Sequence, residues 1–204
     1  MDRYSLIQNV WIILLLWSFI YLGDYFLTIY SAKKFREQLA DHYEFERSFE
    51  LNPIFENDVN NLRLISPRHI IFWVLTSFLF YLLWWITNLS NIRQLFYFMF
   101  GALFLLEITI NLRHLRNIAI IKSYAEGAIF GQIKYSYWFG LKLSAWELFG
   151  FFIFYGFIAF VESSWFFVGG SFGCLILSVK HCKDSNKARK LSIEADSKLK
   201  DAYR

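Results

Sequence analysis

Five long apolar segments alternate with polar, charged stretches along this chain of 204 residues. They cover residues 10–31, 69–88, 94–112, 143–161 and 163–179. A helix needs about 20 mainly apolar residues to cross the hydrocarbon core of a bilayer, and the first four segments are close to that length. The fifth is shorter and rich in glycine, so a re-entrant segment is the alternative there. We therefore predict an all-α, polytopic membrane protein with five transmembrane helices, with residues 1–179 forming the membrane domain.

Two features refine these spans. The fourth and fifth segments are separated by little more than Glu162, which predicts a tight helical hairpin. The first segment contains Asp24 and lacks a cleavage site of small residues, so we expect a retained helix rather than a signal peptide.

Basic residues distinguish the two sides of the membrane, because short loops rich in Lys and Arg remain in the cytoplasm. The N-terminus and the short connections on its side contain only Arg3 and Arg93, whereas residues 32–68, 113–142 and 180–204 contain the other 19 basic residues. We therefore expect the N-terminus outside and the C-terminus inside. If the fifth segment did not cross, eight basic residues of the tail would lie outside, so the asymmetry favours a fifth crossing.

Tryptophan positions agree with these boundaries, since indole rings favour the membrane–water interface. Seven of the eight Trp residues fall near a predicted span end, and only Trp17 lies in the middle of a span. The expected location is a bacterial inner membrane.

The first cytoplasmic loop, residues 32–68, contains two amphipathic stretches. The first presents one apolar stripe at helical spacing, formed by Phe35, Leu39 and Tyr43. Asn52-Pro53 interrupts the helical pattern, and a shorter stripe follows over residues 54–62. Ser66 is the expected N-cap of the second span, with Pro67 at its first position. We interpret the stripes as interfacial helices on the cytoplasmic face; a docking surface or a lid is the alternative.

The basic tail, residues 180–204, has eight basic and four acidic residues, so it carries the whole +4 net charge of the chain. Small and apolar residues recur in it near helical spacing: Ala188, Leu191, Ala195, Leu199 and Ala202. We expect a polar helix that is attracted to anionic lipids at the cytoplasmic face. The alternative is a helix that binds a protein partner, for which loop 32–68 is the second candidate surface.

The composition supports a membrane protein and gives little sign of an enzyme. Hydrophobic residues make up 56% of the chain and charged residues 19%, against about 45–50% and about 25% in soluble domains. The charges outside the tail sum to zero, so nothing indicates nucleic-acid binding. No phosphate loop, nucleophile elbow or dinucleotide fingerprint occurs. Cys174 and Cys182 lack a metal-binding spacing, although Cys182 lies where a palmitoylated cysteine would. Cofactor and metal stay unassigned.

Three acidic residues, Asp24, Glu107 and Glu147, lie inside apolar spans. An ionisable group at mid-bilayer costs roughly 2.5 kcal/mol or more, so its presence suggests a function. At about 1.5 Å per residue, all three should lie roughly 6–11 Å inside the cytoplasmic boundary. The sequence therefore predicts one polar layer shared by three helices.

Further polar residues accompany this layer. The candidate binding residues that join the acids are Thr28, Asn111 and His114. Basic residues that could pair with the acids lie at the inner rim: Arg113, Arg116 and Lys142. Four interpretations stay open: ion pairs that fix helix packing, a cytoplasm-facing cavity for an ion, proton or small ligand, a divalent metal or acid–base site, and acids that are simply hydrated. His and carboxylate side chains suit a metal, but no pair has a tight ligand spacing.

Gly169 and Gly173 form a small-residue face of the kind that lets membrane helices approach closely. We expect this face to pack against the fourth span, residues 143–161. The alternative is a contact between copies of the chain in a homo-oligomer.

Several motifs resemble those of small uncharacterised bacterial multi-pass membrane proteins. The motifs are the intramembrane Asp24-x-x-x-Thr28, Glu50-Leu51-Asn52-Pro53 before the second span, residues 62–68 and residues 113–117. The resemblance covers about the first two spans and one further motif, and the gap between its first two motifs is longer here. It implies a polytopic membrane fold and no particular activity.

The polar and basic features concentrate on the predicted cytoplasmic side. We therefore expect a non-enzymatic inner-membrane protein that binds a partner or small ligand through that face. A small transporter or channel that handles protons or cations with Asp24, Glu107 and Glu147 is one alternative, although the outer halves of the spans are almost purely apolar. An enzyme acting on lipid head groups is the other.

The predicted topology has a direct test. A reporter that is active only in the periplasm, fused after Arg204, should be silent because five crossings and the basic tail place the C-terminus in the cytoplasm. A cytoplasm-active reporter at the same position is the control and should be active. Periplasmic activity at this position would contradict the five-span topology.

Overall fold

The computed structural model describes residues 9–39, 43–45, 54–128, 130–131 and 133–202. Its helices are α1 (Val10–Gln38), α2 (Glu56–Asn60), α3 (Pro67–Leu89), α4 (Arg93–Ala125), α5 (Tyr137–Glu162) and α6 (Trp165–Ala202). Five of them, all except α2, are long and apolar enough to cross a membrane. The predicted all-helical architecture with five spans is confirmed, and the chain is a multi-pass membrane protein.

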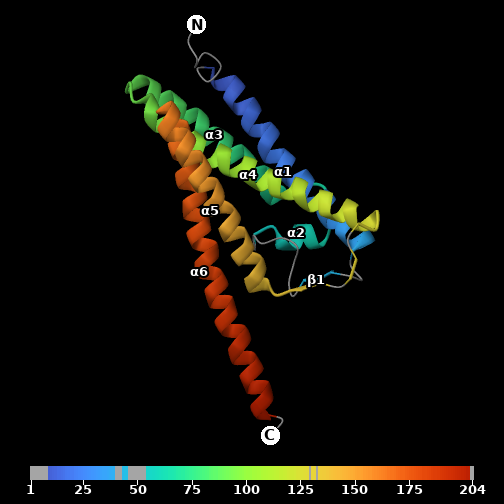
Figure 1. Ribbon diagram of the computed structural model, residues 1–204. Helices are drawn as coiled ribbons and strands as arrows, with labels where there is room; N and C mark the ends of the chain where they lie inside the picture. The colour runs from blue at the N-terminus through green and yellow to red at the C-terminus, as the bar shows by residue number, and fades with distance from the viewer. Residues whose placement is uncertain (1–8, 40–42, 46–53, 129, 132, 203–204) are drawn as a thin grey trace.

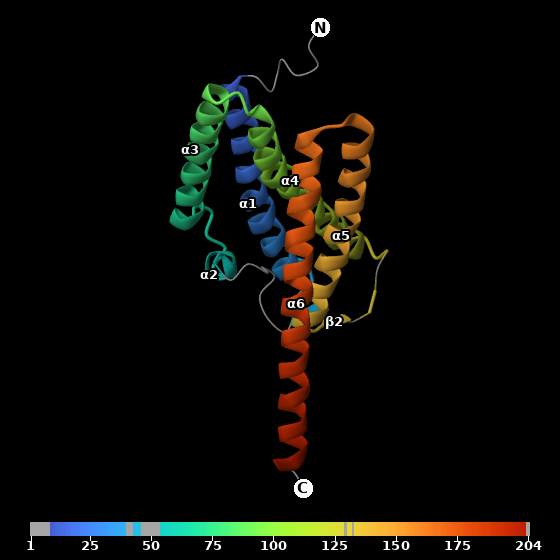
Figure 2. The ribbon, with the colours of Figure 1, turned by 90° about the vertical axis from the view of Figure 1, so that its left-hand side faces the viewer.

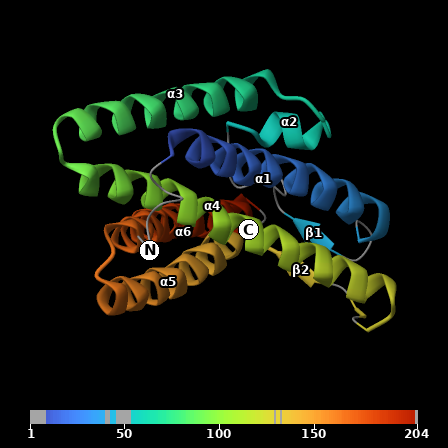
Figure 3. The same cartoon turned by 90° about the horizontal axis from the view of Figure 1, so that it is seen from above.

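Helix α4 lies between two groups of helices. Figure 3 shows α1 and α3 on one side of α4 and the α5–α6 hairpin on the other. Helix α6 continues well past the other helices at its C-terminal end (Figures 1 and 2). The fifth segment is thus part of one continuous helix that is long and apolar enough to cross a membrane.

The loop between the first and second spans differs from the prediction. Helix α1 continues to Gln38, and Tyr43 begins a short strand, β1 (Tyr43–Phe45), so the predicted separate helix carrying Phe35, Leu39 and Tyr43 is wrong. Strand β1 pairs in parallel with β2 (Ile133–Tyr135), which precedes α5, with Glu44 opposite Lys134. Pairing between two loops far apart in sequence leaves no signal in a local pattern. Asn52-Pro53 lies outside the described residues.

Two tryptophans join α1 to α3. Trp17 Nε1 donates a hydrogen bond to Thr76 Oγ1 at 3.1 Å, and Trp73 Nε1 donates to Ser18 Oγ at 3.0 Å. Trp17 is only 1% exposed and packs edge-on against Phe80. A buried indole N–H needs a partner, and Thr76 provides it, which explains why one tryptophan lies in the middle of a span.

A regular ladder of serines joins α5 to α6. Ser171, Ser178 and Ser185 of α6 donate to backbone carbonyls of α5 at 2.7–2.9 Å. The acceptors are the carbonyls of Phe152, Ala145 and Trp138. Both sets repeat every seven residues, so the antiparallel helices present the same stripe to each other along their contact. The predicted tight turn is present, with Ser163 in the left-handed conformation at φ 49°.

Glycines bring α6 directly against α4. A Cβ atom at Gly169 would collide with the carbonyl of Phe98, and one at Gly101 would collide with the carbonyl of Phe166. Gly173 likewise lies against Ala102. The glycine face therefore packs on α4, the third span, and the expected packing against the fourth span is wrong. Because α4 of the same chain covers Gly169, this face is not an exposed contact for a second copy.

The glycine crossing predicts a specific destabilisation. Gly169→Ala should lower the free energy of unfolding by roughly 1–3 kcal/mol, because the added methyl group forces α4 and α6 apart. The matched control is Gly150→Ala on α5, where a Cβ atom meets nothing within 4 Å. Thermal unfolding of the purified variants in detergent measures both effects. Equal melting temperatures for the two variants would contradict the packing.

Candidate functional site

Helix α4 carries polar side chains toward both of its neighbouring groups. Asn111 and His114 contact α1, whereas Arg113 and Arg116 contact α5. Because successive residues of a helix point about 100° apart, this short segment supplies two separate polar sites. We call them the α1–α4 site and the α4–α5 site.

The α1–α4 site contains Asp24, Thr28 and His114. His114 Nε2 lies 2.9 Å from Thr28 Oγ1 and 3.2 Å from Asp24 Oδ1. Thr28 and His114 are buried, and the Asp24 side chain is 24% exposed. The Asp24-x-x-x-Thr28 spacing puts both side chains on one face of α1, so a single histidine reaches both.

The approach of Asp24 Oδ1 favours a proton on Nε2 of His114, whereas the Thr28 hydroxyl can either donate to this nitrogen or accept from it. A carboxylate oxygen only accepts hydrogen bonds, so an unprotonated Nε2 beside Asp24 would set two lone pairs against each other. The other ring nitrogen, Nδ1, is buried and has no hydrogen-bond partner among the described residues. In the neutral ring with its proton on Nε2, this atom is an acceptor, able to take a hydrogen bond from a small donor.

Asn111 and Glu107 lie beside the α1–α4 site. The Asn111 amide donates to the Glu107 carbonyl at 2.8 Å and across the interface to the Ile20 carbonyl at 3.3 Å. Glu107 is half-buried, and both it and Asp24 lie within electrostatic range of Tyr21. Glu107 is two helical turns from His114, roughly 10 Å along α4.

The α4–α5 site pairs Glu147 with two arginines. Arg113 Nε lies 3.1 Å from Glu147 Oε2, and Arg116 Nη1 donates to Oε1 at 2.9 Å. The side chains of Arg113 and Glu147 are 13% and 19% exposed, whereas that of Arg116 is 54% exposed. A carboxylate inside an apolar span is thus neutralised by its neighbours. Lys142, the third candidate partner, is exposed and has no ion pair with any described residue.

The residues of the predicted polar layer therefore lie on two different sides of α4. Asp24, Thr28 and His114 come together, with Asn111 and Glu107 adjacent, while Glu147 lies on the other side of α4 with its arginines. Among the described residues, no three His, Cys, Asp or Glu side chains lie close enough to hold a metal ion.

The sequence pattern did not predict one buried acidic residue, Asp58. Asp58, on the short helix α2, is 3% exposed; it accepts a hydrogen bond from Ser66 Oγ at 2.6 Å and pairs with Arg63 at 3.1 Å. Ser66 in turn caps α3 by accepting from the His69 backbone N–H, as predicted. Asp58 lies in the polar run Glu56-Asn57-Asp58, which resembles a hydrated surface, so only the buried neighbour Val59 hinted at its position.

The Asp58 network joins the C-terminal half of α1 to the start of α3. Tyr25 of α1 donates to the Arg63 carbonyl at 2.6 Å. The rings of Tyr21 and Tyr25 each stack on His69, with centroids 4.4 Å apart. His69 is 4% exposed. The segment from α2 to α3 is thus held to the C-terminal half of α1 by buried polar groups and aromatic stacking.

Comparisons of the chain with protein-family models, with curated proteins and with solved structures found no match.

The α4–α5 site predicts unequal effects of two conservative changes. Glu147→Gln should cost roughly 2 kcal/mol of stability, because it leaves the little-exposed Arg113 without its carboxylate. Arg116→Gln, the matched control, should cost less than about 1 kcal/mol, since Arg116 is mostly exposed and Glu147 keeps Arg113. Thermal unfolding in detergent compares them. A larger loss for Arg116→Gln would show that the pairing is wrong.

Proposed function

We propose that this multi-pass membrane protein is a non-enzymatic anchor that binds a helical protein in the cytoplasm through the C-terminal part of α6. The observation that carries the proposal is the length of α6, which runs unbroken for 38 residues. At about 1.5 Å per residue this is about 57 Å, nearly twice the hydrocarbon thickness of about 30 Å. The basic tail is therefore a rigid extension of a membrane helix.

The face by which α6 packs on α5 continues beyond α5. Helix α5 begins at Tyr137, and the last serine of the ladder, Ser185, bonds to the neighbouring Trp138. Ser192 lies one heptad beyond Ser185 on α6. Four residues before Ser185, His181 also contacts α5, through Ser144. The matching position, four residues before Ser192, is Ala188. Small residues thus repeat where α5 is no longer present. A partner helix docked there would extend an existing interface.

Charge determines which partner suits this surface. The tail, residues 180–204, has a net charge of +4, so two tails side by side would repel each other. An acidic helix would be attracted. We therefore assign the surface to a different protein with an acidic helix rather than to a second copy of this chain.

The geometry gives less support to the transport alternative. Glu147 is paired with two arginines, and Asp24 Oδ1 lies 3.2 Å from His114 Nε2, so both acids have polar or charged neighbours within the helix bundle. Acidic residues that carry protons or cations along a pathway need access to water and to each other. Here Asp24 and Glu147 lie on different sides of α4.

Site-specific photo-crosslinking in cells tests the proposed docking face. A photoreactive residue at Ser192 should give one discrete adduct with a protein whose crosslinked peptide is acidic and helical. The matched control is the same residue at Lys190, about 160° away around the helix, which should give none.

Blocking the face completes the experiment. Ala188→Leu should abolish the Ser192 adduct, since a bulky side chain prevents close helix approach, while Lys187→Gln should leave most of it. Equal adducts from both positions, adducts only with lipid or with the same chain, or an adduct insensitive to Ala188→Leu would refute the proposal.

A further inference from the structure

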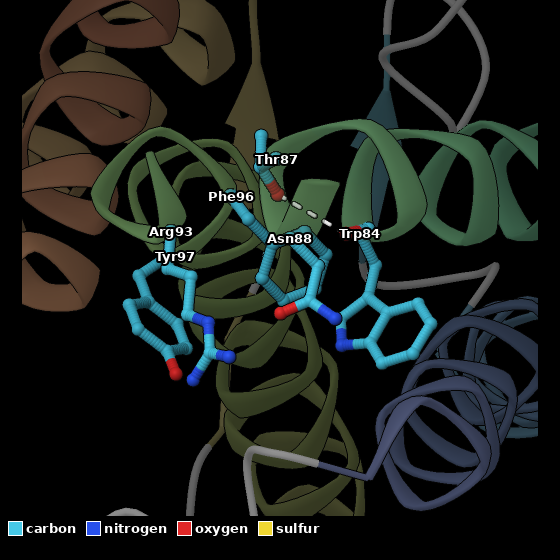
Figure 4. A pocket seen from close by; sticks show the side chains of 6 residues that line it. All are labelled: Trp84, Thr87, Asn88, Arg93, Phe96 and Tyr97. Carbon is cyan, nitrogen blue, oxygen red and sulfur yellow. Dashed lines mark hydrogen bonds between the residues drawn. The ribbon is translucent and has the colours of Figure 1, made fainter. Parts of the chain in front are cut away.

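A cavity of about 150 Å³ lies at the opposite end of the molecule, where α3 turns into α4. It is lined by Trp84, Thr87, Asn88, Arg93, Phe96 and Tyr97. Figure 4 shows the side chains of Trp84, Asn88 and Arg93 around one opening. Thr87 and Phe96 are buried and form its floor, whereas Asn88 and Arg93 are exposed at its rim.

Two of the residues that line this cavity, Arg93 and Trp84, only donate hydrogen bonds, and no polar side chain in the lining is an acceptor only. Arg93 provides a guanidinium group, Trp84 an indole N–H and Asn88 an amide. Arg93 makes no ion pair or hydrogen bond with a described residue, and no acidic side chain lines the cavity. An uncompensated cation among donors favours an anion.

The N-terminus of α4 adds a second positive electrostatic contribution at the cavity. Arg93 is the first residue of α4, and its N-cap residue Ile92 provides no side-chain hydrogen bond. The first N–H groups of a helix lack partners within the helix, and the helix dipole makes this end positive. Arg93 and the positive end of α4 therefore act on a ligand at the same rim.

The surroundings of the cavity are those of a membrane interface. Trp84 and Tyr97 are half-buried aromatic residues of the kind that gather at the level of lipid head groups. Residues close in sequence to the cavity lining have exposed apolar side chains: Leu89 is 70% exposed, Ile92 48% and Leu95 46%. A ligand with a charged head and apolar chains would satisfy both environments.

We propose that this cavity binds the phosphate of an anionic membrane phospholipid, on the side opposite the basic tail. Arg93 contacts the phosphate, Asn88 and Trp84 donate hydrogen bonds at the rim, and the acyl chains lie along Leu89, Ile92 and Leu95. Phosphatidylglycerol, whose neutral glycerol leaves the phosphate charge uncompensated, is favoured over phosphatidylcholine, because the lining contains no carboxylate to match the choline cation.

Native mass spectrometry of the full chain in detergent, with phosphatidylglycerol or phosphatidylcholine added, tests the assignment. The wild type should bind one phosphatidylglycerol about tenfold more tightly than phosphatidylcholine. Arg93→Gln should weaken this tightest binding about tenfold, because a charge-assisted contact is lost. Lys142→Gln removes an exposed, unpaired cation at the other end and should leave it unchanged, which controls for lipid attracted to the basic side.

Melting temperatures separate loss of the site from loss of the fold. Phosphatidylglycerol should raise the melting temperature of the wild type and of Lys142→Gln but not that of Arg93→Gln, and all three should melt alike without lipid. Unchanged phosphatidylglycerol binding in Arg93→Gln, or equal binding of both lipids, overturns the proposal. Complete displacement by inorganic phosphate overturns the lipid assignment in favour of a free anion.

Discussion

A polar group between lipid-embedded helices has to find its partner within the protein, because hydrocarbon offers no hydrogen bonds. The contacts of this chain follow from that constraint. Trp17 bonds to Thr76, the serines of α6 bond to carbonyls of α5, and Glu147 is paired with two arginines. Each bond also joins two helices, so the requirement to satisfy buried polar atoms simultaneously fixes which helices are neighbours. Apolar packing alone would leave these choices open, since lipid tails pack against leucine as well as protein does.

Helix α4 has the largest share of these constraints. Gly101 of α4 lets α6 approach closely. His114 contacts Asp24 and Thr28 of α1, and the arginines of α4 contact Glu147 of α5. The residues of the two polar sites alternate along one short stretch of this helix, with Asn111 and His114 in one site and Arg113 and Arg116 in the other. A movement of α4 about its own axis would therefore disturb both sites together, which couples the α1–α3 group to the α5–α6 hairpin.

The features that the sequence could predict are local in kind. The five spans follow from apolar length, and the Ser66 cap with Pro67 follows from one turn of backbone. The partner of the glycine face could not be predicted, because it depends on how α4 and α6 cross. The parallel pairing of β1 with β2 also joins segments about 90 residues apart. Helix rise gives an estimate of how deep each acid lies, but it does not give the direction of the side chain around the helix. That direction places Asp24 and Glu147 on different sides of α4.

The serine ladder has a consequence for how the hairpin is assembled. Because donors and acceptors both repeat every seven residues, sliding α6 along α5 by one heptad, about 10.5 Å, would restore two of the three bonds. The ladder thus holds the helices together without defining their register. The register has to come from the short turn at Ser163, which permits a single alignment, and from the glycine crossing with α4. In this hairpin, the hydrogen bonds that hold the two helices together and the contacts that set their register come from different parts of the chain.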